Sequence, residues 1–78
     1  MPLNNVELLT LGRRIRRARK LLGFSQKAFA TKSGLDRSYL GIMERGDLNI
    51  NFSVLCDICE GLACDIATVT RGILSLPS

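Results

Sequence analysis

The chain has 78 residues, of which 11 are lysine or arginine and 7 are aspartate or glutamate, so its formal net charge is +4. A chain of this length forms one domain and buries only about 60% of the surface that its unfolded state exposes. We therefore expect modest stability, to which oligomerisation would add. The basic balance, with a pI near 9.4, favours association with polyanions but carries no information about the fold.

Several function classes are disfavoured by what the sequence lacks. No stretch approaches the roughly 18 unbroken apolar residues that a membrane span needs, and no basic region precedes the first apolar one, so no secretory signal is predicted. Three cysteines without such a signal are expected to be reduced thiols in a cytoplasmic protein. The sequence has no histidine and no tryptophan and offers no catalytic constellation, so we expect no enzyme, no metal, no cofactor and no small-molecule ligand.

A long first helix is predicted from apolar residues at steps of three and four. Gly23 follows the last of them, as is typical of a glycine at a helix C-terminus. Six basic residues between positions 13 and 20 spread over most of the helix circumference, so they form a largely solvated, charged face. The apolar stripe consists of Leu8, Leu11, Ile15, Ala18 and Leu22.

Two short helices are predicted next, separated by a very short turn. Ser25 is a good N-cap for the first, which contains Ala28, Phe29 and Ala30 and ends near Ser33 and Gly34. Asp36 caps the second, which turns Leu40 and Met43 inward and ends near Gly46. Burial of these two side chains should stabilise the second helix by roughly 1.5–3 kcal/mol each.

Two more helices complete the predicted fold. Residues 47–51 form a loop that Asn51 or Ser53 caps into a fourth helix, and Asp65 caps a fifth helix over about 65–75. The fourth helix is expected to bury Phe52, Leu55, Ile58, Cys59 and Leu62, and the fifth has Ile66, Val69, Ile73 and Leu76 at helical steps. The sequence therefore predicts an all-α fold of five helices in a single domain, residues 1–78.

Two helices joined by a short turn that contains glycine form a helix-turn-helix unit, here over about residues 25–45. The segment FSQKAFATKSGLDRSYLGIMERG resembles the XRE-type helix-turn-helix family of lambdoid phage repressors and Cro, and LDRSYLGIMERG is most similar to the controller proteins of restriction–modification systems. The resemblance covers residues 11–73 and departs at Ala63, where the family usually has glycine. It implies a lambda-repressor-like, prokaryotic DNA-binding domain whose third helix enters the major groove with its first turn at the base edges.

Four residues of the third helix are candidates for reading bases. Arg37 could bond guanine O6 and N7 together, with a phosphate contact or a solvated arginine as the alternatives. Ser38 would bond a base or a phosphate, and Tyr39 would either stack on the sugar-phosphate backbone or pack at the domain edge. Ile42 would either meet a thymine methyl or be partly buried. Glycine at position 41 costs a helix about 1 kcal/mol relative to alanine, and its reason stays open between close approach of the DNA backbone or a packed helix and drift on an exposed face.

Phosphate contacts are expected around the start of the second helix, where unpaired amides and the helix dipole favour anions. Gln26 matches a glutamine of the family at this place, and Lys27 follows it. Asn49 and Asn51 would either reach the backbone from the other side or serve as turn and cap residues. The full set of candidate phosphate ligands is Ser25, Gln26, Lys27, Lys32, Arg45, Asn49, Asn51, Arg13 and Arg17.

Two further groups are interpreted as structural. Arg19 lies near the apolar stripe and matches a family arginine that pairs with the glutamate matching Glu44, so the resemblance implies a structural ion pair between them. Cys56 and Cys59 have a ligand-like spacing and Cys64 could be a third ligand, but a structural zinc site needs four. The cysteines are therefore expected to pack in the core, with a thiol sensor as the alternative.

The function that follows is that of a sequence-specific transcription regulator, a homodimer on a palindromic operator in double-stranded DNA. The expected dimer interface is Ile66, Val69, Thr70, Ile73 and Leu74. An antitoxin-type interaction module is the alternative, because such proteins use the same fold. RNA binding through the arginine-rich helix is disfavoured by the single tyrosine and the lack of an aromatic platform.

Overall fold

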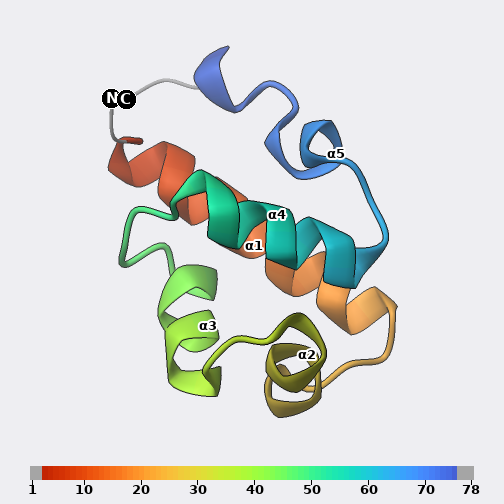
Figure 1. Ribbon diagram of the computed structural model, residues 1–78. Helices are drawn as coiled ribbons and strands as arrows, with labels where there is room; N and C mark the ends of the chain where they lie inside the picture. The colour runs from red at the N-terminus through yellow and green to blue at the C-terminus, as the bar shows by residue number, and fades with distance from the viewer. Residues whose placement is uncertain (1–2, 76–78) are drawn as a thin grey trace.

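The computed structural model describes residues 3–75, which form five α-helices and one short 3-10 helix, with no strand in that range. Helices α1 and α4 cross the middle of the molecule, α2 and α3 lie at one end, and α5 and η1 lie at the other (Figure 1). This arrangement confirms the predicted five-helix, all-α fold. The elements are α1 (Asn5–Leu21), α2 (Gln26–Ser33), α3 (Arg37–Glu44), α4 (Phe52–Leu62), α5 (Ile66–Thr70) and η1 (Ile73–Ser75).

One hydrophobic core joins all the elements. Its fully buried large side chains come from the first four helices, and Val69 of α5 and Ile73 of η1 close it from the other end, each at most 3% exposed. The fully buried side chains are Leu11, Ile15, Phe29, Leu40, Met43 and Ile58.

Side-chain caps fix where four of the helices begin. Ser25 and Asp36 cap α2 and α3 as predicted, and Asn51 rather than Ser53 caps α4. At the start of α1, Asn4 and Glu7 form a capping box that the sequence prediction missed: Asn4 Oδ1 accepts from the Glu7 N–H at 2.8 Å, and Glu7 Oε1 accepts from the Asn4 N–H at 2.9 Å.

Two residues that were predicted to be buried are exposed. Leu22 is 51% exposed and Phe52 is 69% exposed. Leu22 is the C-cap of α1 and Phe52 is the first residue of α4. Each residue stands at a helix end. The helical spacing of apolar residues includes it in the inward stripe, but other parts of the chain cover little of its side chain.

The fifth helix is shorter than predicted. It ends at Thr70, because Arg71 leaves the helical region with a ψ of 124° and Gly72 takes a φ of 73°. Asp65 occupies the N-cap position without a side-chain hydrogen bond. The predicted helical position Leu76 lies outside the described residues.

Arg14 explains why the fifth helix stops there. Its guanidinium donates to the backbone oxygens of Val69, at 3.0 Å, and Arg71, at 2.7 Å. A continuing helix would have used these carbonyls for its own hydrogen bonds. The side chain of Arg14 therefore anchors the end of α5 to α1, a role that the sequence prediction, which placed this arginine on a solvated face, did not foresee.

Gly12 allows α1 to pack directly on the end of α3. A Cβ at this position would lie 2.5 Å from the Met43 carbonyl oxygen and 2.6 Å from that of Glu44. No side chain fits there, so glycine lets the two backbones approach closely. This contact holds α3 in place relative to the long first helix.

Candidate nucleic-acid interface

The turn between α2 and α3 sets the angle at which the third helix leaves the core. Gly34 adopts a left-handed conformation with a φ of 72°, which glycine reaches without strain. The Leu35 N–H then donates to the Ala30 carbonyl at 2.8 Å, which closes α2. Asp36 accepts from the Tyr39 N–H at 3.2 Å and starts α3 immediately afterwards. These local bonds produce the predicted helix-turn-helix.

The two faces of α3 have opposite character. Leu40 and Met43 are 0% exposed and hold the helix on the core. Arg37 and Ser38, in the first turn, are exposed, and neither is bonded to another described side chain. The leading edge of α3 thus projects into solvent with free polar groups.

The other two candidate base-reading residues are half-buried. Tyr39 packs against the core cluster, as the domain-edge alternative expects, and remains partly exposed. Ile42 is also half-buried and lines a hollow beside Arg37 and Ser38. Both therefore border the exposed edge of α3.

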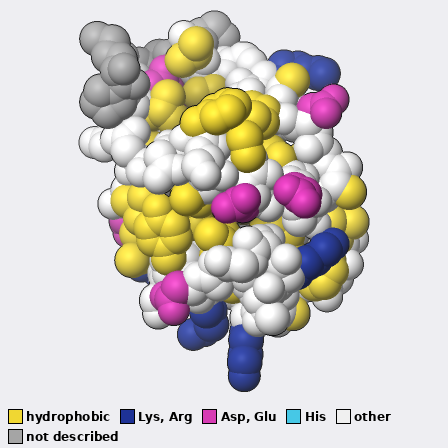
Figure 2. Space-filling model, viewed as in Figure 1, with side chains coloured by type: hydrophobic (Ala, Val, Ile, Leu, Met, Phe, Trp, Pro, Cys, Tyr) yellow, Lys and Arg dark blue, Asp and Glu magenta, His cyan; other side chains and the backbone are white. Residues whose placement is uncertain are grey.

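The starts of α2 and α3 form one surface, which we call the α2–α3 surface. Gln26 and Arg37 line two adjoining hollows on it, one with residues of α3 and the other with Ser25 and Lys27. Figure 2 shows lysine and arginine side chains at the end of the molecule where α2 and α3 lie, and acidic side chains over α4. The residues lining the two hollows are Arg19, Ser25, Gln26, Lys27, Arg37, Ser38, Gly41, Ile42 and Arg45, with no carboxylate among them.

A buried ion pair lies beneath this surface. Arg19 Nε is 2.7 Å from Glu44 Oε2, and Arg19 Nη2 is 2.9 Å from Glu44 Oε1. The remaining Arg19 nitrogen donates to the Phe24 carbonyl at 2.7 Å. Gln26 Nε2 donates to Glu44 Oε1 at 3.1 Å. The network ties α1 and the first residue of α2 to Glu44, the last residue of α3.

Gly41 sits under the side chains of its neighbours and is buried. A Cβ there would lie 3.6 Å from Arg45 Nη1 and 3.7 Å from Gln26 Oε1, which are ordinary contact distances. An alanine would fit, so no packing requirement of the described chain explains this glycine.

Several candidate phosphate ligands also have structural partners. Asn49 Oδ1 accepts from the Leu3 N–H at 2.9 Å, and Asn51 Oδ1 accepts from the Val54 N–H at 2.8 Å, as the turn-and-cap alternative predicts. Arg45 forms an exposed ion pair with Asp47 at 3.2 Å. A pair with both side chains more than 60% exposed is weak, so Arg45 can exchange Asp47 for another anion.

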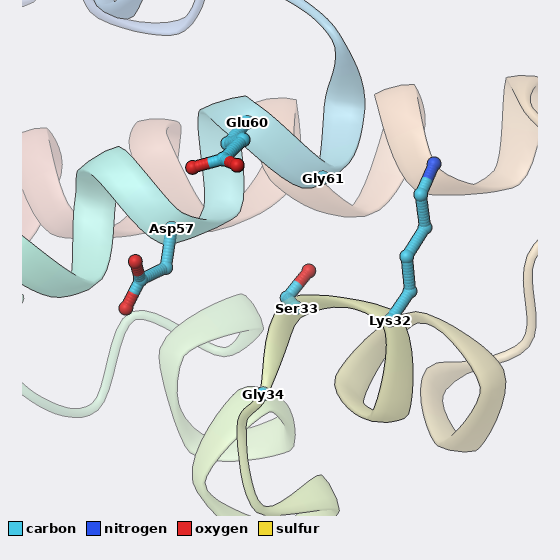
Figure 3. A pocket seen from close by; sticks show the side chains of 6 residues that line it. All are labelled: Lys32, Ser33, Gly34, Asp57, Glu60 and Gly61. Carbon is cyan, nitrogen blue, oxygen red and sulfur yellow. The ribbon is translucent and has the colours of Figure 1, made fainter.

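Lys32 lies away from the α2–α3 surface. Its Nζ sits 4.8 Å from the centre of the Phe24 ring, and its side chain points from α2 toward α1 (Figure 3). It lines a pocket between α2 and α4 with the carboxylates Asp57 and Glu60, which would repel phosphate. In the same pocket the Ser33 oxygen points toward Gly61.

Arg13 and Arg17 lie on the exposed face of α1. With Arg16, Lys20 and Leu21 they line a hollow that shares no residue with those of the α2–α3 surface. They contribute positive potential near the interface and form no part of its described hollows.

The cysteines lie on α4 and just after it. Cys59 is 3% exposed and belongs to the core, whereas Cys56 and Cys64 are half-buried, and all three are free thiols. Burial, followed by the neighbouring Cys64, raises the pKa of the Cys59 thiol to about 11. Among residues 3–75 no three side chains of histidine, cysteine, aspartate or glutamate are placed to hold a metal ion.

Two of the five expected interface residues are buried and cannot contact a second chain. Val69 and Ile73 are 2% and 3% exposed because they complete the core of their own chain. Leu74, by contrast, is 83% exposed, and Ile66 and Thr70 are half-buried. Periodicity in the sequence could not separate the inner from the outer residues, because the helix they were assigned to breaks after Thr70.

Comparison with known proteins places the chain in a family. The helix-turn-helix family model matches residues 15–69. A curated relative, the uncharacterized HTH-type transcriptional regulator YazB of Bacillus subtilis, is 36% identical over 66 residues, which are 85% of this chain and 88% of the relative. No helix within residues 3–75 has the length and apolar character to cross a membrane.

Solved structures of helix-turn-helix regulators have the same fold as this chain. The restriction–modification controller protein C.AhdI from Aeromonas hydrophila superposes with a TM-score of 0.79 at 35% identity, over 81% of this chain and 96% of that one. SinR, a master regulator for biofilm formation solved in complex with DNA, gives a TM-score of 0.73 at 32% identity, over 76% and 95% of the two chains. The chain therefore belongs to the XRE-type helix-turn-helix family of DNA-binding transcription regulators.

Proposed function

We propose that the chain regulates transcription as a homodimer bound to a palindromic operator, in the manner of a restriction–modification controller protein. The observation that carries the proposal is the division of α3 into a buried face and a free leading edge. Leu40 and Met43 fix the helix, while Arg37 and Ser38 stand in solvent beside the cationic start of α2. A helix held in this way can enter the major groove by its first turn.

Within this proposal Arg37 reads bases. Its exposed guanidinium can donate to guanine O6 and N7 together, which discriminates by about 1–3 kcal/mol. Ser38 bonds a neighbouring base or phosphate. Tyr39 lies against the sugar-phosphate backbone with its outer edge, and Ile42 meets a thymine methyl where its half-exposed side chain borders the hollow.

The phosphate backbone is held mainly at the start of α2. The free N–H groups there and the side chain of Lys27 favour an anion, and Ser25 and Gln26 border the same hollow. Arg45 adds a contact after releasing Asp47. Asn49 and Asn51 contribute through their amide groups, and Arg13 and Arg17 act on phosphates further along the duplex. Lys32 is left out because it lies beside Asp57 and Glu60.

Self-association rests on the exposed part of the C-terminal elements. Leu74 is 83% exposed, and the half-buried Ile66 and Thr70 precede it on α5. Two-fold pairing would double the DNA contacts of a domain that covers only a short half-site. It predicts half-sites about 34–36 Å apart on one face of the duplex.

A surface substitution tests the dimer better than truncation, because α5 and η1 supply core residues. Leu74→Asp should shift the chain to monomer in analytical ultracentrifugation and weaken operator binding, without loss of helical content. Leu21→Asp is the matched control, since Leu21 is 77% exposed on α1 and should leave the dimer intact. If both variants stay dimeric, the interface lies elsewhere.

The proposal as a whole is tested by selecting bound sequences from a pool of random duplex DNA. We expect an enriched motif of two inverted half-sites separated by about one helical turn. The 35% identity to C.AhdI supports the controller assignment, which further predicts such a motif upstream of the gene for this chain. An enriched motif without two-fold symmetry would contradict the homodimer, and no enrichment would contradict specific binding.

A further inference from the structure

The end of α4 brings two cysteines together. The Cys64 N–H donates to the Cys59 carbonyl at 3.0 Å, and the Ala63 N–H donates to the Glu60 carbonyl, also at 3.0 Å. Ala63 adopts a left-handed conformation with a φ of 55°. These features define a Schellman motif, in which the side chains of the residues joined by the longer bond commonly contact each other. Here both of those residues carry thiols.

The two thiols are adjacent and can be reached from solvent. Cys64 lies close enough to Cys59 to help raise the pKa of the Cys59 thiol. Both line an open hollow with Glu60, Ala63 and Thr68. Cys64 is half-buried, so it meets a dissolved reagent before Cys59, which is 3% exposed.

We propose that Cys59 and Cys64 are an oxidation site that closes reversibly into an intramolecular disulfide, with a hydroperoxide as the oxidant. The Cys64 thiolate attacks one peroxide oxygen, the O–O bond breaks, and Cys64 becomes a sulfenic acid, while the leaving hydroxide or alkoxide takes up the proton that the Cys64 thiol lost and departs as water or an alcohol. The Cys59 sulfur then attacks the Cys64 sulfur and displaces hydroxide, which takes up the Cys59 proton and leaves as water. The two sulfurs together lose two electrons, and the peroxide gains them.

Cys56 is the less suitable partner for Cys59. The two residues are three positions apart within α4, where side chains stand about 5–6 Å apart between Cβ atoms. A disulfide needs a Cβ separation of about 3.5–4.5 Å, so a bond between them would distort the helix. The Schellman motif brings the chain at Cys64, which lies beyond the end of the helix, back over Cys59.

The closed form would restrain the corner between α4 and α5. The disulfide would close a short loop across Ala63, whose left-handed conformation it would lock. Because a short loop removes less entropy from the unfolded chain than a long one, the gain in global stability should be smaller than for a disulfide between distant segments. We expect the local effect to be larger: amide hydrogens of α5 should exchange more slowly in the oxidised chain.

The full-length chain treated with hydrogen peroxide tests the assignment by mass spectrometry. We expect the intact mass to fall by two hydrogens, and the number of thiols that react with N-ethylmaleimide after denaturation to fall from three to one. Cleavage after Glu60, which lies between the cysteines, should leave two peptides joined until a reductant is added. Cys56→Ser is the control that should oxidise like the parent chain.

Variants at the two sites complete the experiment. Cys64→Ser, at a half-buried position, and Cys59→Ala should each abolish the loss of two hydrogens, and circular dichroism reports whether they remain helical. Cys64 is the less buried of the two, so its substitution should disturb the fold less. Cys64→Ser therefore tests the proposal even if Cys59→Ala fails to fold. The proposal is overturned if Cys56→Ser abolishes the product, if the disulfide joins two chains, or if peroxide converts the thiols only to sulfinic acids.

Discussion

Arg19 of α1 and Glu44 of α3 form a bidentate ion pair in which both side chains are at most 5% exposed. Gln26 of α2 bonds the same carboxylate. One buried carboxylate therefore sets the relative positions of the three helices that frame the α2–α3 surface. Removal of a single partner strongly destabilises the fold, because it leaves an uncompensated charge in the interior.

Glu44→Gln should accordingly lower the free energy of unfolding by about 3–5 kcal/mol, measured by urea denaturation. Asp47→Asn is the control, because it breaks the exposed pair with Arg45 and should cost less than about 1 kcal/mol. Equal losses in the two variants would mean that the buried pair is no more important to stability than the surface pair.

Gly41→Ala should stabilise the chain by about 1 kcal/mol, because alanine favours the helix and its methyl group meets Gln26 and Arg45 at ordinary contact distances. The melting temperature should rise. Operator affinity should be unchanged, since Gly41 is already covered by those side chains. A stable variant with weakened operator binding would instead indicate that the DNA backbone approaches Gly41.

Stability should fall at high pH through Cys59. Burial and the nearby Cys64 raise the pKa of this thiol from 9.0 to about 11, so the folded chain favours the protonated form. The protonated thiol therefore contributes to the free energy of unfolding. This stabilisation is fully present below pH 9 and is lost as the pH rises through 11, a change of up to about 3 kcal/mol. Urea denaturation at pH 8 and pH 11 should therefore show a smaller difference for Cys59→Ala than for the parent chain, and equal differences would contradict the shift.

Operator affinity should fall steeply with salt, because phosphate contacts release counterions. Lys27→Ala should weaken binding to all sequences alike and reduce the slope of log affinity against log salt by about one. Titrations between about 50 and 200 mM salt measure both effects. Arg16→Ala, on the α1 face outside the α2–α3 surface, should change the slope less, and an equal change would add Arg16 to the phosphate ligands.

The helix-turn-helix could be predicted from sequence because its determinants are local. The caps at Ser25 and Asp36 act within three residues, and Gly34 needs only its own backbone freedom. The burial of Leu40 and Met43 follows from helical periodicity. Such features are set by neighbours in the chain, so the α3 face expected from the sequence is the one the structure has.

The remaining features depend on contacts between distant segments. Arg14 ends α5 by binding carbonyls 55 and 57 positions away, which no pattern in either segment indicates. The burial of Val69 and Ile73 depends on the distant core residues that they pack against. The direction of Lys32, over the Phe24 ring and toward α1, likewise depends on how α2 packs against distant segments of the chain.

The central claim is that the first turn of α3 meets the base edges through Arg37. The most direct test measures the affinities of the parent chain and Arg37→Ala for the selected operator and for a set of operators with single base-pair changes. We predict that the variant loses discrimination, by about 1–3 kcal/mol, at one base pair in each half-site and keeps it elsewhere. A uniform loss of affinity for every operator, with all base preferences retained, would contradict the claim and make Arg37 a phosphate ligand.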